Sequence, residues 1–590
     1  MKLARFLLSR EGFISVLCYT VTAVFSFLSF SPANLPFFVW FAPFGLFVIE
    51  KRNRGEWKKL IYHGFGFAIL FYLVSFHWIY HMTTVFGGFE WYLAVPIFLG
   101  SAILLNFKFP VFLVLFSFLA IKVRRFFPLI VSFAVLVSEF LTPQVFPWYF
   151  GNIVAENHIL AQNAEYTSAY GLSGFLFFVS YFLFYIRKPK RTMRLISKFS
   201  SIMKKNKIFA KQMFTGLGAL VFVLLVFFGN GFYLYNKWNH MKPIAERDVL
   251  IVQPNAPLEF RDGRNPAEEI RNLMTRIDRM VEQELKNKPV DLVVLPESGV
   301  PFFTTHDSEI TRAMRIYWHQ FESLMAIITL RHGANLYFNE LDADIPEEKR
   351  GSRISRNDIR TYNSSVLMSP NGERKNSYQK VFLLIFGEYM PFEWMYALSG
   401  QTGQFAPGSK LDLIPYYEAR KTPSTVAKDL HWEDTFGLSP NSVREHYRTN
   451  QVEEKQIGSF LPLICYEVII SEFVRKFEGD PDFIVNVTND KWYGNSVESY
   501  QHHTLGRMRA IEFRKWIVRS TNSGTSVFTD HLGRNIDNEF TPIESTATIR
   551  KKVAVIPGEM TFYRLYGNLL SYLFMGIVGI VFFFYVKRNS

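Results

Sequence analysis

The sequence predicts a chain in two parts: a multi-span α-helical membrane domain of about eight transmembrane helices, and an α/β domain outside the bilayer. Hydrophobic residues make up 49% of the 590 residues and charged residues only 20%, whereas soluble domains carry about a quarter charged residues. Apolar runs of about 20 residues recur before residue 240 and at the C-terminal end. Between 247 and 560 these runs shorten to strand length and alternate with amphipathic stretches. The composition excludes both a single soluble globule and a disordered chain.

Eight apolar segments are candidates for membrane crossings, because a helix needs about 20 apolar residues to span the hydrocarbon core. The predicted spans lie at 12–30, 35–50, 60–80, 91–121, 126–143, 168–186, 213–236 and 565–586. The second and fifth are short. The fourth is long and contains Lys108 and Pro110, so it fits either one kinked helix or two short segments. If this segment is a single helix, loops rich in Lys and Arg alternate along the chain with loops that lack them.

The charge distribution predicts the orientation of the chain in the membrane. The net charge is +14, but residues 1–240 hold 23 Lys and Arg against 7 Glu, and the run 187–211 alone holds ten basic residues. Basic residues gather in alternate loops and at both ends, which is the pattern of cytoplasmic loops rather than of a nucleic-acid-binding face. We therefore expect both termini in the cytoplasm, the segment 241–564 on the outer side, and an uncleaved first span.

The predicted domains are 1–240 with seven spans, 247–560 with the α/β fold, and 565–590 with the last span and a basic tail. Within the second domain, 410–456 is charged and poorly periodic, so we expect a long surface insertion there. Amphipathic stretches predict helices over 266–285 and 308–321. Short apolar runs predict strands at 249–252, 292–295, 326–329, 365–368, 461–464 and 483–487.

Cysteine usage and motif content limit the cofactors that the chain could hold. The only cysteines are Cys18 and Cys465, which exclude a disulfide scaffold and a four-cysteine zinc site. We expect both to be free thiols. The sequence contains no cluster of metal ligands and no nucleotide-binding loop, so we expect no cofactor and no metal.

Three polar residues stand near the ends of predicted strands, where an α/β sheet presents functional groups. Glu297 follows the run 292–295, Cys465 follows 461–464, and Lys380 lies eight residues before Glu388. A thiolate is a strong nucleophile, a buried carboxylate can accept its proton, and an ammonium group can stabilise an oxyanion. Together the three groups suit acyl transfer without histidine, although each residue alone also fits an ordinary structural role.

Longer motifs surround these positions and occur in the rest of the chain: Pro296-Glu297-Ser298, Lys380 with Gly387-Glu388, Cys465-Tyr466-Glu467, Phe76-His77-Trp78-Ile79-Tyr80, Phe146-Pro147-Trp148, Thr361-Tyr362-Asn363-Ser364, Asn489-Asp490-Lys491-Trp492-Tyr493-Gly494, Arg507-Met508-Arg509-Ala510-Ile511-Glu512 and Arg519-Ser520-Thr521-Asn522-Ser523-Gly524. The first three resemble the Glu-Lys-Cys triad motifs of the nitrilase (carbon–nitrogen hydrolase) superfamily. With the membrane spans included, the whole chain resembles the apolipoprotein N-acyltransferase family of bacteria.

The chain departs from the family pattern at positions outside the triad. Ile385 stands where the family usually has a Pro before its Gly-Glu motif, and Phe260 is the nearest counterpart of a family Trp. The stretch that includes Asn489 and Asp490 also fits an ordinary solvated turn.

The resemblance implies an α-β-β-α sandwich for the second domain and a catalytic triad in it. Cys465 would be the nucleophile, Glu297 its general base and Lys380 the oxyanion stabiliser. Glu388 would support the lysine and the proton transfers.

Three further residues are implied to shape the site. Tyr466 and Glu467 would form the wall beside the nucleophile, with the Tyr466 N–H as an oxyanion donor, and Asn363 would play a supporting part.

The family also implies the reaction and the partners. A phospholipid would donate an acyl chain to the cysteine as a thioester, and the amino group of a diacylglyceryl-cysteine apolipoprotein would accept it. The protein would lie in the bacterial cytoplasmic (inner) membrane, with its catalytic domain on the periplasmic side and the lipid bilayer as a partner. A monomer would suffice, and no nucleic acid is involved.

Aromatic residues in the outer loops have two interpretations. Trp78, Tyr80 and Trp148 are candidates for a lipid entry path, and they equally fit the aromatic belt found at membrane interfaces.

Two other classes of function stay open at this point. A membrane-tethered amidase or nitrilase would use the same triad on a small amide or nitrile, but one helix would be enough to tether it. A transporter or a scaffold with a degenerate domain would need no triad, and a transporter usually carries more ionisable residues within its spans than Lys108 and a few groups near span ends.

Overall fold

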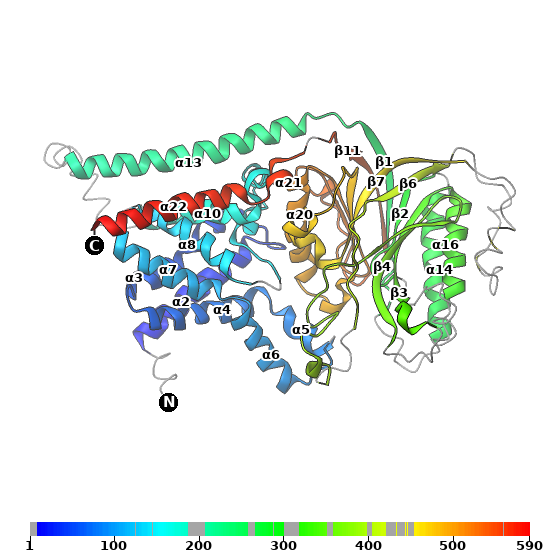
Figure 1. The fold of residues 1–590 in the computed structure, drawn as a ribbon, viewed down its shortest axis with the longest axis horizontal. Coiled ribbons are helices and arrows are strands. Elements are labelled where there is room, and N and C mark those ends of the chain that lie inside the picture. The colour runs from blue at the N-terminus through cyan, green and yellow to red at the C-terminus, as the bar shows by residue number, and fades with distance from the viewer. Residues whose placement is uncertain are drawn as a thin grey trace.

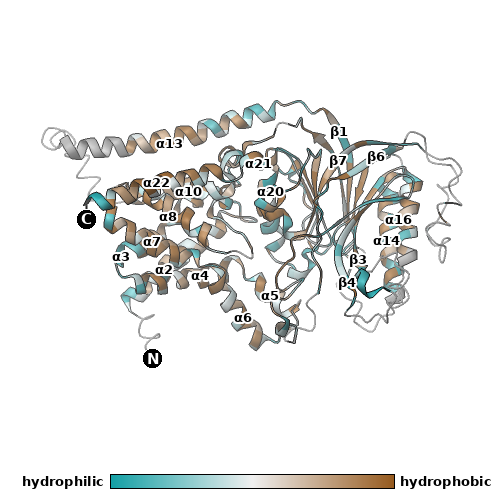
Figure 2. Ribbon diagram, in the orientation of Figure 1, coloured by the Kyte–Doolittle hydropathy of each residue, from teal (hydrophilic) through white to brown (hydrophobic). Residues whose placement is uncertain are grey.

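The computed structural model describes residues 9–85, 87–123, 126–143, 146–186, 207–257, 266–286, 288–299, 318–350, 358–397, 404–419, 432, 443, 445, 453–558 and 560–589. Helices occupy one end of the molecule and two packed sheets the other, and the last helix returns to the helical end (Figure 1). Apolar residues cover much of the helical end (Figure 2). The apolar segments of the sequence therefore form the helical end, and the segment 247–560, with its shorter apolar runs, forms the end with the two sheets.

The helical part is formed by residues 10–239 and completed by the helices at the C-terminal end. Its elements are α2 (Arg10–Leu28), η1 (Pro36–Phe41), α3 (Phe44–Arg52), α4 (Trp57–Ser75), α5 (Trp78–Val85), α6 (Trp91–Leu104), α7 (Lys108–Val123), α8 (Phe127–Leu141), η2 (Phe150–Val154), α9 (His158–Ala161), α10 (Ala164–Ile186), α13 (Lys207–Asn239), α21 (Phe562–Tyr566) and α22 (Leu569–Asn589).

Fewer helices than the predicted eight are long and apolar enough to cross a membrane. Within the described residues five candidates meet that test: Arg10–Leu28, Trp91–Val123, Ala164–Tyr185, Leu217–Asn239 and Leu569–Arg588. The pair α4 and α5 would make a sixth, although the two helices meet at a bend of 74°. The count of eight is therefore not confirmed.

The shortfall has local causes in the sequence. The predicted span 35–50 is divided into η1 and α3, with Pro36 and Pro43 at the two starts, because proline is suited to the start of a helix and not to its interior. The predicted span 126–143 forms α8 of 15 residues. The long segment 91–121 is interrupted between α6 and α7, although it counts as one candidate span.

The α/β part contains two sheets in the described residues. Their strand orders are β11-β1-β2-β3-β4-β5 and β10-β9-β8-β7-β6. The strands are β1 (Ala245–Gln253), β2 (Leu292–Val294), β3 (Asn335–Asp344), β4 (Arg360–Met368), β5 (Arg374–Gln379), β6 (Ile414–Ala419), β7 (Glu454–Ile464), β8 (Phe483–Thr488), β9 (Ile517–Thr521), β10 (Val527–Thr529) and β11 (Ala547–Val555). The neighbours β1, β2 and β3 run parallel, as do β7, β8 and β9.

Helices cover the outer faces of the two sheets, which gives the layer order α-β-β-α (Figure 1). The helices are α14 (Pro266–Leu285), α16 (Trp318–His332), α19 (Ser471–Val474) and α20 (Glu498–Phe513), and short 3₁₀ turns are η3 (Glu347–Lys349), η5 (Glu393–Ala397), η7 (Cys465–Ile469), η8 (Asp490–Tyr493) and η9 (Ile536–Asn538). The first sheet is covered by α14 and α16, and α20 lies between the second sheet and the helical part. The expected sandwich is therefore present.

The local sequence explains why α14 forms where the pattern predicts it. Pro266 stands at its first position and Glu268 and Glu269 follow in the first turn, where proline fits the helix start and acidic groups favour the positive end of the helix dipole. Its buried residues recur at helical spacing: Ile270, Leu273, Met274, Ile277, Val281 and Leu285.

One of the sequence predictions in this part is wrong. The run 326–329, predicted as a strand, lies inside α16. This helix is buried on several sides, as Met325, Ile327 and Ile328 show, so its apolar run has no helical period to distinguish it from a strand. The stretch 410–456, predicted as a long surface insertion, begins with β6, which pairs with β7, and most of 420–452 falls outside the described residues. Most of 308–321 falls outside the described residues.

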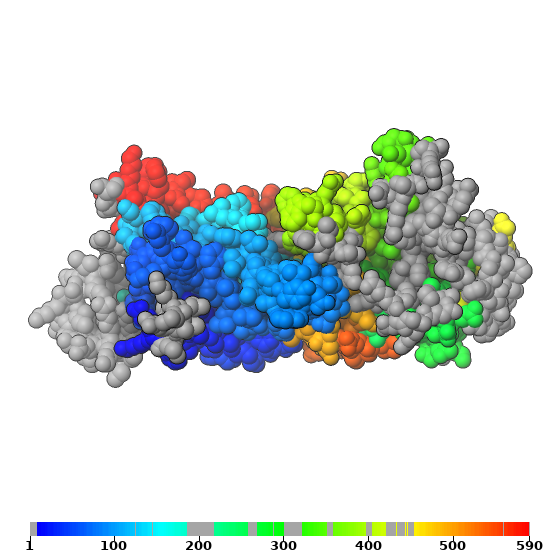
Figure 3. All heavy atoms as spheres, turned by 90° about the horizontal axis from the view of Figure 1, so that it is seen from below, coloured from blue at the N-terminus to red at the C-terminus, as the bar shows by residue number. Residues whose placement is uncertain are grey.

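Direct contacts join the helical part to α20 of the α/β part. The Trp78 Nε1–H donates to Gln501 Oε1 at 3.0 Å, and Gln501 donates to the Ser75 carbonyl at 3.0 Å. Arg507 donates to the Ala155 carbonyl at 2.6 Å. From below, the blue helical segments meet the yellow-green and orange segments of the α/β part (Figure 3).

Candidate active site

The three predicted catalytic residues lie just past the ends of strands that belong to the two facing sheets. Glu297 follows β2, Lys380 follows β5, and Cys465 follows β7 and opens η7. The Lys380 Nζ is 3.9 Å from Glu297 Oε1. Cys465 is close enough to both for their charges to act on its thiol. The fold therefore brings together three residues that lie up to 168 positions apart in the chain.

A second carboxylate and an amide complete the cluster. The Lys380 Nζ is 2.8 Å from Glu388 Oε2. Asn363 donates one hydrogen bond to Glu297 at 2.7 Å and one to Glu388 at 2.9 Å, so it spaces the two acids. The backbone N–H of Asn489 donates to the other Glu297 oxygen at 2.9 Å. Both acids are thus fixed by donors and by one shared cation.

Cys465 occupies a strained backbone position at the strand end. Its φ is 55°, in the left-handed region that residues other than glycine rarely adopt. The Asn486 amide donates to the Cys465 carbonyl at 3.0 Å, and this bond helps to hold the turn. The residue is 6% exposed, so its thiol is largely shielded from solvent.

Burial controls the proton affinities in the cluster. Burial raises the pKa of the Cys465 thiol, the charge of Glu297 adds to that shift, and Lys380 opposes it. Burial also raises the pKa of Glu297, against the charge of Lys380. For Lys380, burial acts to lower the pKa, but Glu388 and the other negative groups outweigh it, so the pKa is raised. The lysine is therefore a fixed cation beside an acid of increased basicity.

Glu467 ties the segment of the lysine to the segment of the cysteine. Its carboxylate accepts hydrogen bonds from the N–H groups of Val381 at 3.0 Å and Phe382 at 2.9 Å, which directly follow Lys380. Its other oxygen accepts from the N–H of Ile464, the residue before the cysteine, at 2.9 Å. Burial raises the pKa of Glu467 to about 7.

Tyr466 forms an aromatic wall beside the cysteine. Its hydroxyl donates to the Leu383 carbonyl at 2.8 Å, and the Lys380 Nζ lies 5.6 Å from its ring centroid. Phe146 of the helical part stacks on it, with centroids 6.1 Å apart, and Phe382 meets its edge. The wall thus joins both parts of the molecule.

The predicted lipid-entry residues do not all lie in one place. Trp78 and Tyr80 line a cavity of about 1220 Å³ between the helical part and the segment 493–500. Its lining includes the apolar residues Val95 and Phe98 of α6. Trp148 is buried elsewhere, with its ring centroid 4.1 Å from the Lys108 Nζ.

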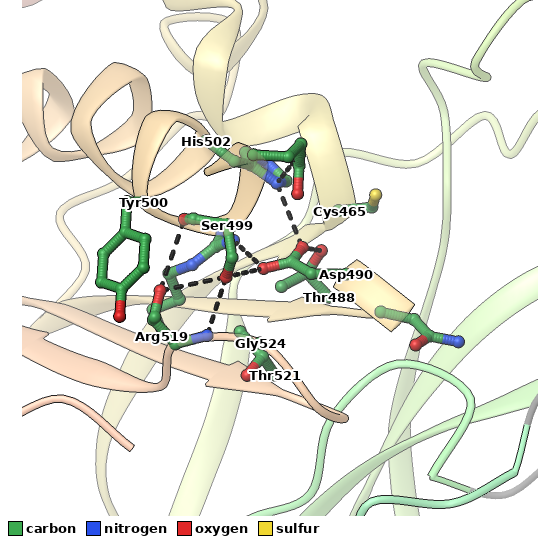
Figure 4. A network of polar contacts seen from close by, with 12 residues as sticks. Cys465, Thr488, Asp490, Ser499, Tyr500, His502, Arg519, Thr521 and Gly524 are labelled. Atoms are coloured by element: carbon green, nitrogen blue, oxygen red, sulfur yellow. Dashed lines mark hydrogen bonds and ion pairs between the residues drawn. The ribbon is translucent and has the colours of Figure 1, made fainter. Parts of the chain in front are cut away.

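A buried polar network lies behind the cysteine, and the sequence patterns do not predict it (Figure 4). Asp490 is 2% exposed, so the interpretation of its segment as a solvated turn is wrong. Arg519 donates to Asp490 at 2.8 Å and to Asn486 at 2.6 Å, and Ser499 donates to Asp490 at 2.6 Å. The motifs around Asp490 and Arg519 are visible in the sequence, but nothing there shows that they meet.

Asp490, Glu498 and His502 also lie close enough together for a metal ion, with one ligand atom of each within 4.8 Å of the others. The Arg519 guanidinium already balances the charge of Asp490, and the Asp490 oxygens already accept hydrogen bonds from Thr488, Ser499 and Arg519. The arrangement is therefore a hydrogen-bonded network around an arginine, and the donor set does not require a cation.

Both parts of the chain are similar to known protein families. Residues 251–549 match the protein family described as "Carbon-nitrogen hydrolase". Residues 22–182 match the family described as "Apolipoprotein N-acyltransferase N-terminal domain". A protein of Leptospira interrogans named apolipoprotein N-acyltransferase 2 is 47% identical over 578 residues, which cover 96% of this chain and 95% of that protein. The chain belongs to the apolipoprotein N-acyltransferase family.

More distant members of the apolipoprotein N-acyltransferase family match over nearly the same length. Apolipoprotein N-acyltransferase 1 of Leptospira interrogans is 28% identical and covers 92% of this chain and 91% of its own. The Pasteurella multocida apolipoprotein N-acyltransferase is 25% identical and covers 93% and 91%. Family membership therefore extends over the helical and the α/β parts together.

Proposed function

We propose that this protein transfers an acyl chain from a phospholipid to the α-amino group of a diacylglyceryl-cysteine at the N-terminus of an apolipoprotein. The observation that carries the proposal is the 47% identity to an apolipoprotein N-acyltransferase over 96% of the chain. The cluster of Glu297, Lys380 and Cys465 supports it, because it supplies a base, a cation and a nucleophile for acyl transfer.

In the first half-reaction Glu297 accepts the proton of the Cys465 thiol. The thiolate sulfur attacks the ester carbonyl of the phospholipid, and a tetrahedral oxyanion forms. Lys380 stabilises this oxyanion, together with the N–H of Tyr466. The carbon–oxygen bond of the ester then breaks, and lysophospholipid leaves with the proton that Glu297 held. The acyl chain remains on the sulfur as a thioester.

In the second half-reaction the amino group of the acceptor attacks the thioester carbonyl. Glu297 accepts a proton from the attacking nitrogen, and the carbon–sulfur bond of the tetrahedral intermediate breaks. The proton returns to the cysteine sulfur, so the enzyme ends in its starting state. The acceptor leaves with a new amide bond. Because one product departs before the second substrate reacts, the kinetics should be ping-pong.

The neighbours of the triad are assigned supporting roles. Asn363 holds the two carboxylates at a fixed separation through its two hydrogen bonds. Glu388 neutralises the lysine at 2.8 Å, which keeps the cation in place between turnovers. Glu467 fixes both the lysine segment and the cysteine segment through backbone N–H groups.

The helical part gives the reaction access to lipids. Exposing an acyl chain to water costs about 0.8 kcal/mol per methylene, so both substrates favour a site next to the bilayer. The cavity lined by Trp78 and Tyr80 is also lined by apolar residues of α6 and by polar residues of the segment 493–500. This combination suits a path for a lipid, whereas the buried Trp148 suits an anchoring role.

The proposed domains are a membrane domain at 1–240, a catalytic domain at 247–560 and a final span at 565–590. The distribution of basic residues supports cytoplasmic termini and a periplasmic catalytic domain in the bacterial inner membrane. A monomer holds every residue that this mechanism uses.

The proposal is tested with purified protein in phospholipid nanodiscs and a synthetic diacylglyceryl-cysteine lipopeptide. We expect the lipopeptide to gain the mass of one acyl group as an amide and lysophospholipid to appear in equal amount. A matched assay measures ammonia released from small amides. Ammonia release together with an unchanged lipopeptide would contradict the proposal and would indicate an amidase.

A further inference from the structure

Lys108 is a buried cation in the helical part that the proposed reaction does not use. It begins α7 within the candidate span Trp91–Val123 and is 2% exposed. Its Nζ donates to the Trp148 carbonyl at 2.5 Å, and it lies 4.1 Å from the centroid of the Trp148 ring and 5.7 Å from that of Phe150. The carbonyl oxygen and the two aromatic rings replace the water that a buried ammonium group loses. Because a charge inside an apolar bundle is unfavourable, a lysine at this position points to a function.

Two further side chains of the bundle hold the backbone directly after that carbonyl. Glu139 of α8 accepts a hydrogen bond from the Phe150 N–H at 2.8 Å, and Ser173 of α10 accepts one from the Gly151 N–H at 2.8 Å. Gly151 lies so close to α10 that a Cβ atom there would be 1.8 Å from a carbonyl oxygen of that helix. Three helices therefore hold the backbone of the segment 148–151.

Phe146, two residues before Trp148, connects this segment to the candidate active site. Its ring stacks on the Tyr466 ring, with centroids 6.1 Å apart. Tyr466 directly follows Cys465, and the Lys380 Nζ is 5.6 Å from the centroid of the Tyr466 ring. The bundle therefore reaches the wall beside the nucleophile through an aromatic contact.

The other end of the same loop is held by the α/β part. Arg507 of α20 donates to the Ala155 carbonyl at 2.6 Å, and its guanidinium is 3.2 Å from a carboxylate oxygen of Glu156. The loop is thus fixed by the α/β part at 155 and by the bundle at 148–151. These two attachments set where Phe146 lies relative to Tyr466.

We propose that Lys108 is a positioning residue for acyl transfer, which holds Phe146 against Tyr466 through the backbone of this loop. The proposal rests on the proposed function, since it takes Cys465 as the nucleophile. The N–H of Tyr466 and the ammonium group of Lys380 are the proposed donors to the oxyanion. Such donors stabilise a transition state only in the correct geometry, so a displaced wall should slow the chemistry. Lys108 itself touches no substrate, and its own bonds and proton do not change.

The test uses full-length protein in mixed micelles of detergent and phospholipid. Lys108→Met keeps the length of the side chain and removes the donor and the charge, whereas Phe146→Leu removes the ring at the other end of the connection. The two substitutions are also combined. Lys122→Met is the matched control, because Lys122 is an exposed lysine in the last turn of the same helix. Thermal unfolding selects the folded variants, and Phe146→Leu tests the connection if Lys108→Met does not fold.

Thioester formation is measured over a range of phospholipid fractions. In Lys108→Met and Phe146→Leu we expect the maximal rate to fall about tenfold. The phospholipid fraction that gives half of this rate should stay unchanged, because the wall acts on the transition state and not on the binding of lipid. The double variant should be no slower than the slower single variant, since both residues act through one connection. The control should match wild type.

Alkylation of Cys465 by iodoacetamide, mapped by peptide mass, is the second measurement. It should become faster in both single variants, because a loosened wall admits the reagent to a thiol that is largely shielded. The double variant should be alkylated no faster than the faster single variant.

Wild-type rates in Phe146→Leu would overturn the inference. Single effects that multiply in the double variant would also overturn it, since Lys108 would then act independently of Phe146. A raised half-saturating fraction with an unchanged maximal rate would contradict it as well, because Lys108 would then serve the binding of lipid. If the wild type forms no thioester, the proposed function fails, whereas the alkylation rates still decide whether Lys108 positions the wall.

Discussion

Arg514 donates two hydrogen bonds to a single oxygen of Glu165, at 2.8 and 2.7 Å, although the two residues are 349 positions apart. Arg514 directly follows α20, and Glu165 lies in the first turn of α10. The Trp238 Nε1–H donates to the same oxygen at 2.9 Å. Both charged side chains are buried. This pair joins the α/β part to two segments of the helical part.

Loss of the Arg514–Glu165 ion pair should weaken the attachment between the α/β part and the helical part. Removing one partner of a buried ion pair leaves an uncompensated charge and costs about 3–5 kcal/mol. We expect Glu165→Gln to lower the thermal unfolding midpoint clearly and to speed proteolysis between the two parts. The control is Glu246→Gln, because Glu246 and Lys552 form an exposed pair at 3.3 Å, which contributes little. Equal behaviour of the two variants would contradict the role of the junction.

The buried lysine should matter for stability and for chemistry in separable ways. Lys380→Met leaves Glu297 and Glu388 without their shared cation, so we expect both a lower unfolding midpoint and loss of thioester formation. The double variant Lys380→Met/Glu388→Gln removes one of the uncompensated charges. It should regain part of the stability and none of the activity. Recovery of activity in the double variant would show that Lys380 only balances charge.

Removal of the proposed base should slow the chemistry without unfolding the protein. Glu297→Gln keeps the size of the side chain but cannot accept the thiol proton. General-base catalysis contributes about 10²- to 10⁴-fold, so we expect the rate of thioester formation to fall within that range. Single-turnover kinetics on phospholipid nanodiscs measures this rate. The same substitution at Glu269, in the first turn of α14, is the control and should leave the rate unchanged. A Glu297→Gln variant as fast as wild type would exclude Glu297 as the base.

The buried acid Glu498 should affect stability in a pH-dependent manner. Burial raises its pKa well above the usual value, and Asp490 adds to the shift. The unfolded chain ionises this group near pH ~4.3, whereas the folded protein ionises it at a higher pH. Stability is therefore fully present below that pH and falls as pH rises towards the folded pKa. Glu498→Gln removes this loss.

Unfolding midpoints at about pH 5, 6, 7 and 8 test the sign of this effect. Relative to wild type, Glu498→Gln should become more favourable as pH rises. Asp490→Asn should lower the midpoint by a similar amount at all four pH values, because the Asp490 pKa is lowered and its stabilising charge is lost only below the unfolded pKa of about 3.9. Parallel midpoint curves for wild type and Glu498→Gln would show that this acid is ionised in the fold.

The sequence is most informative where a strand ends in a polar residue. Glu297 and Cys465 each follow a short apolar run, and these runs form β2 and β7. Patterning fails at 326–329, because a helix that is buried on several sides shows no amphipathic period. It also cannot show that Asp490 meets Arg519, since that contact depends on the pairing of β8 with β9. Local signals predict elements, whereas contacts between distant elements need the fold.

The central claim is that Cys465 carries the acyl chain between the two substrates. Intact-mass measurement after incubation with phospholipid, without acceptor, tests it most directly. The wild type and Cys18→Ala should each gain one acyl mass that hydroxylamine removes, because Cys18 lies in α2 of the helical part. Cys465→Ala should gain none. An acyl adduct on Cys465→Ala, or no adduct on wild-type protein that still modifies lipopeptide, would contradict the account.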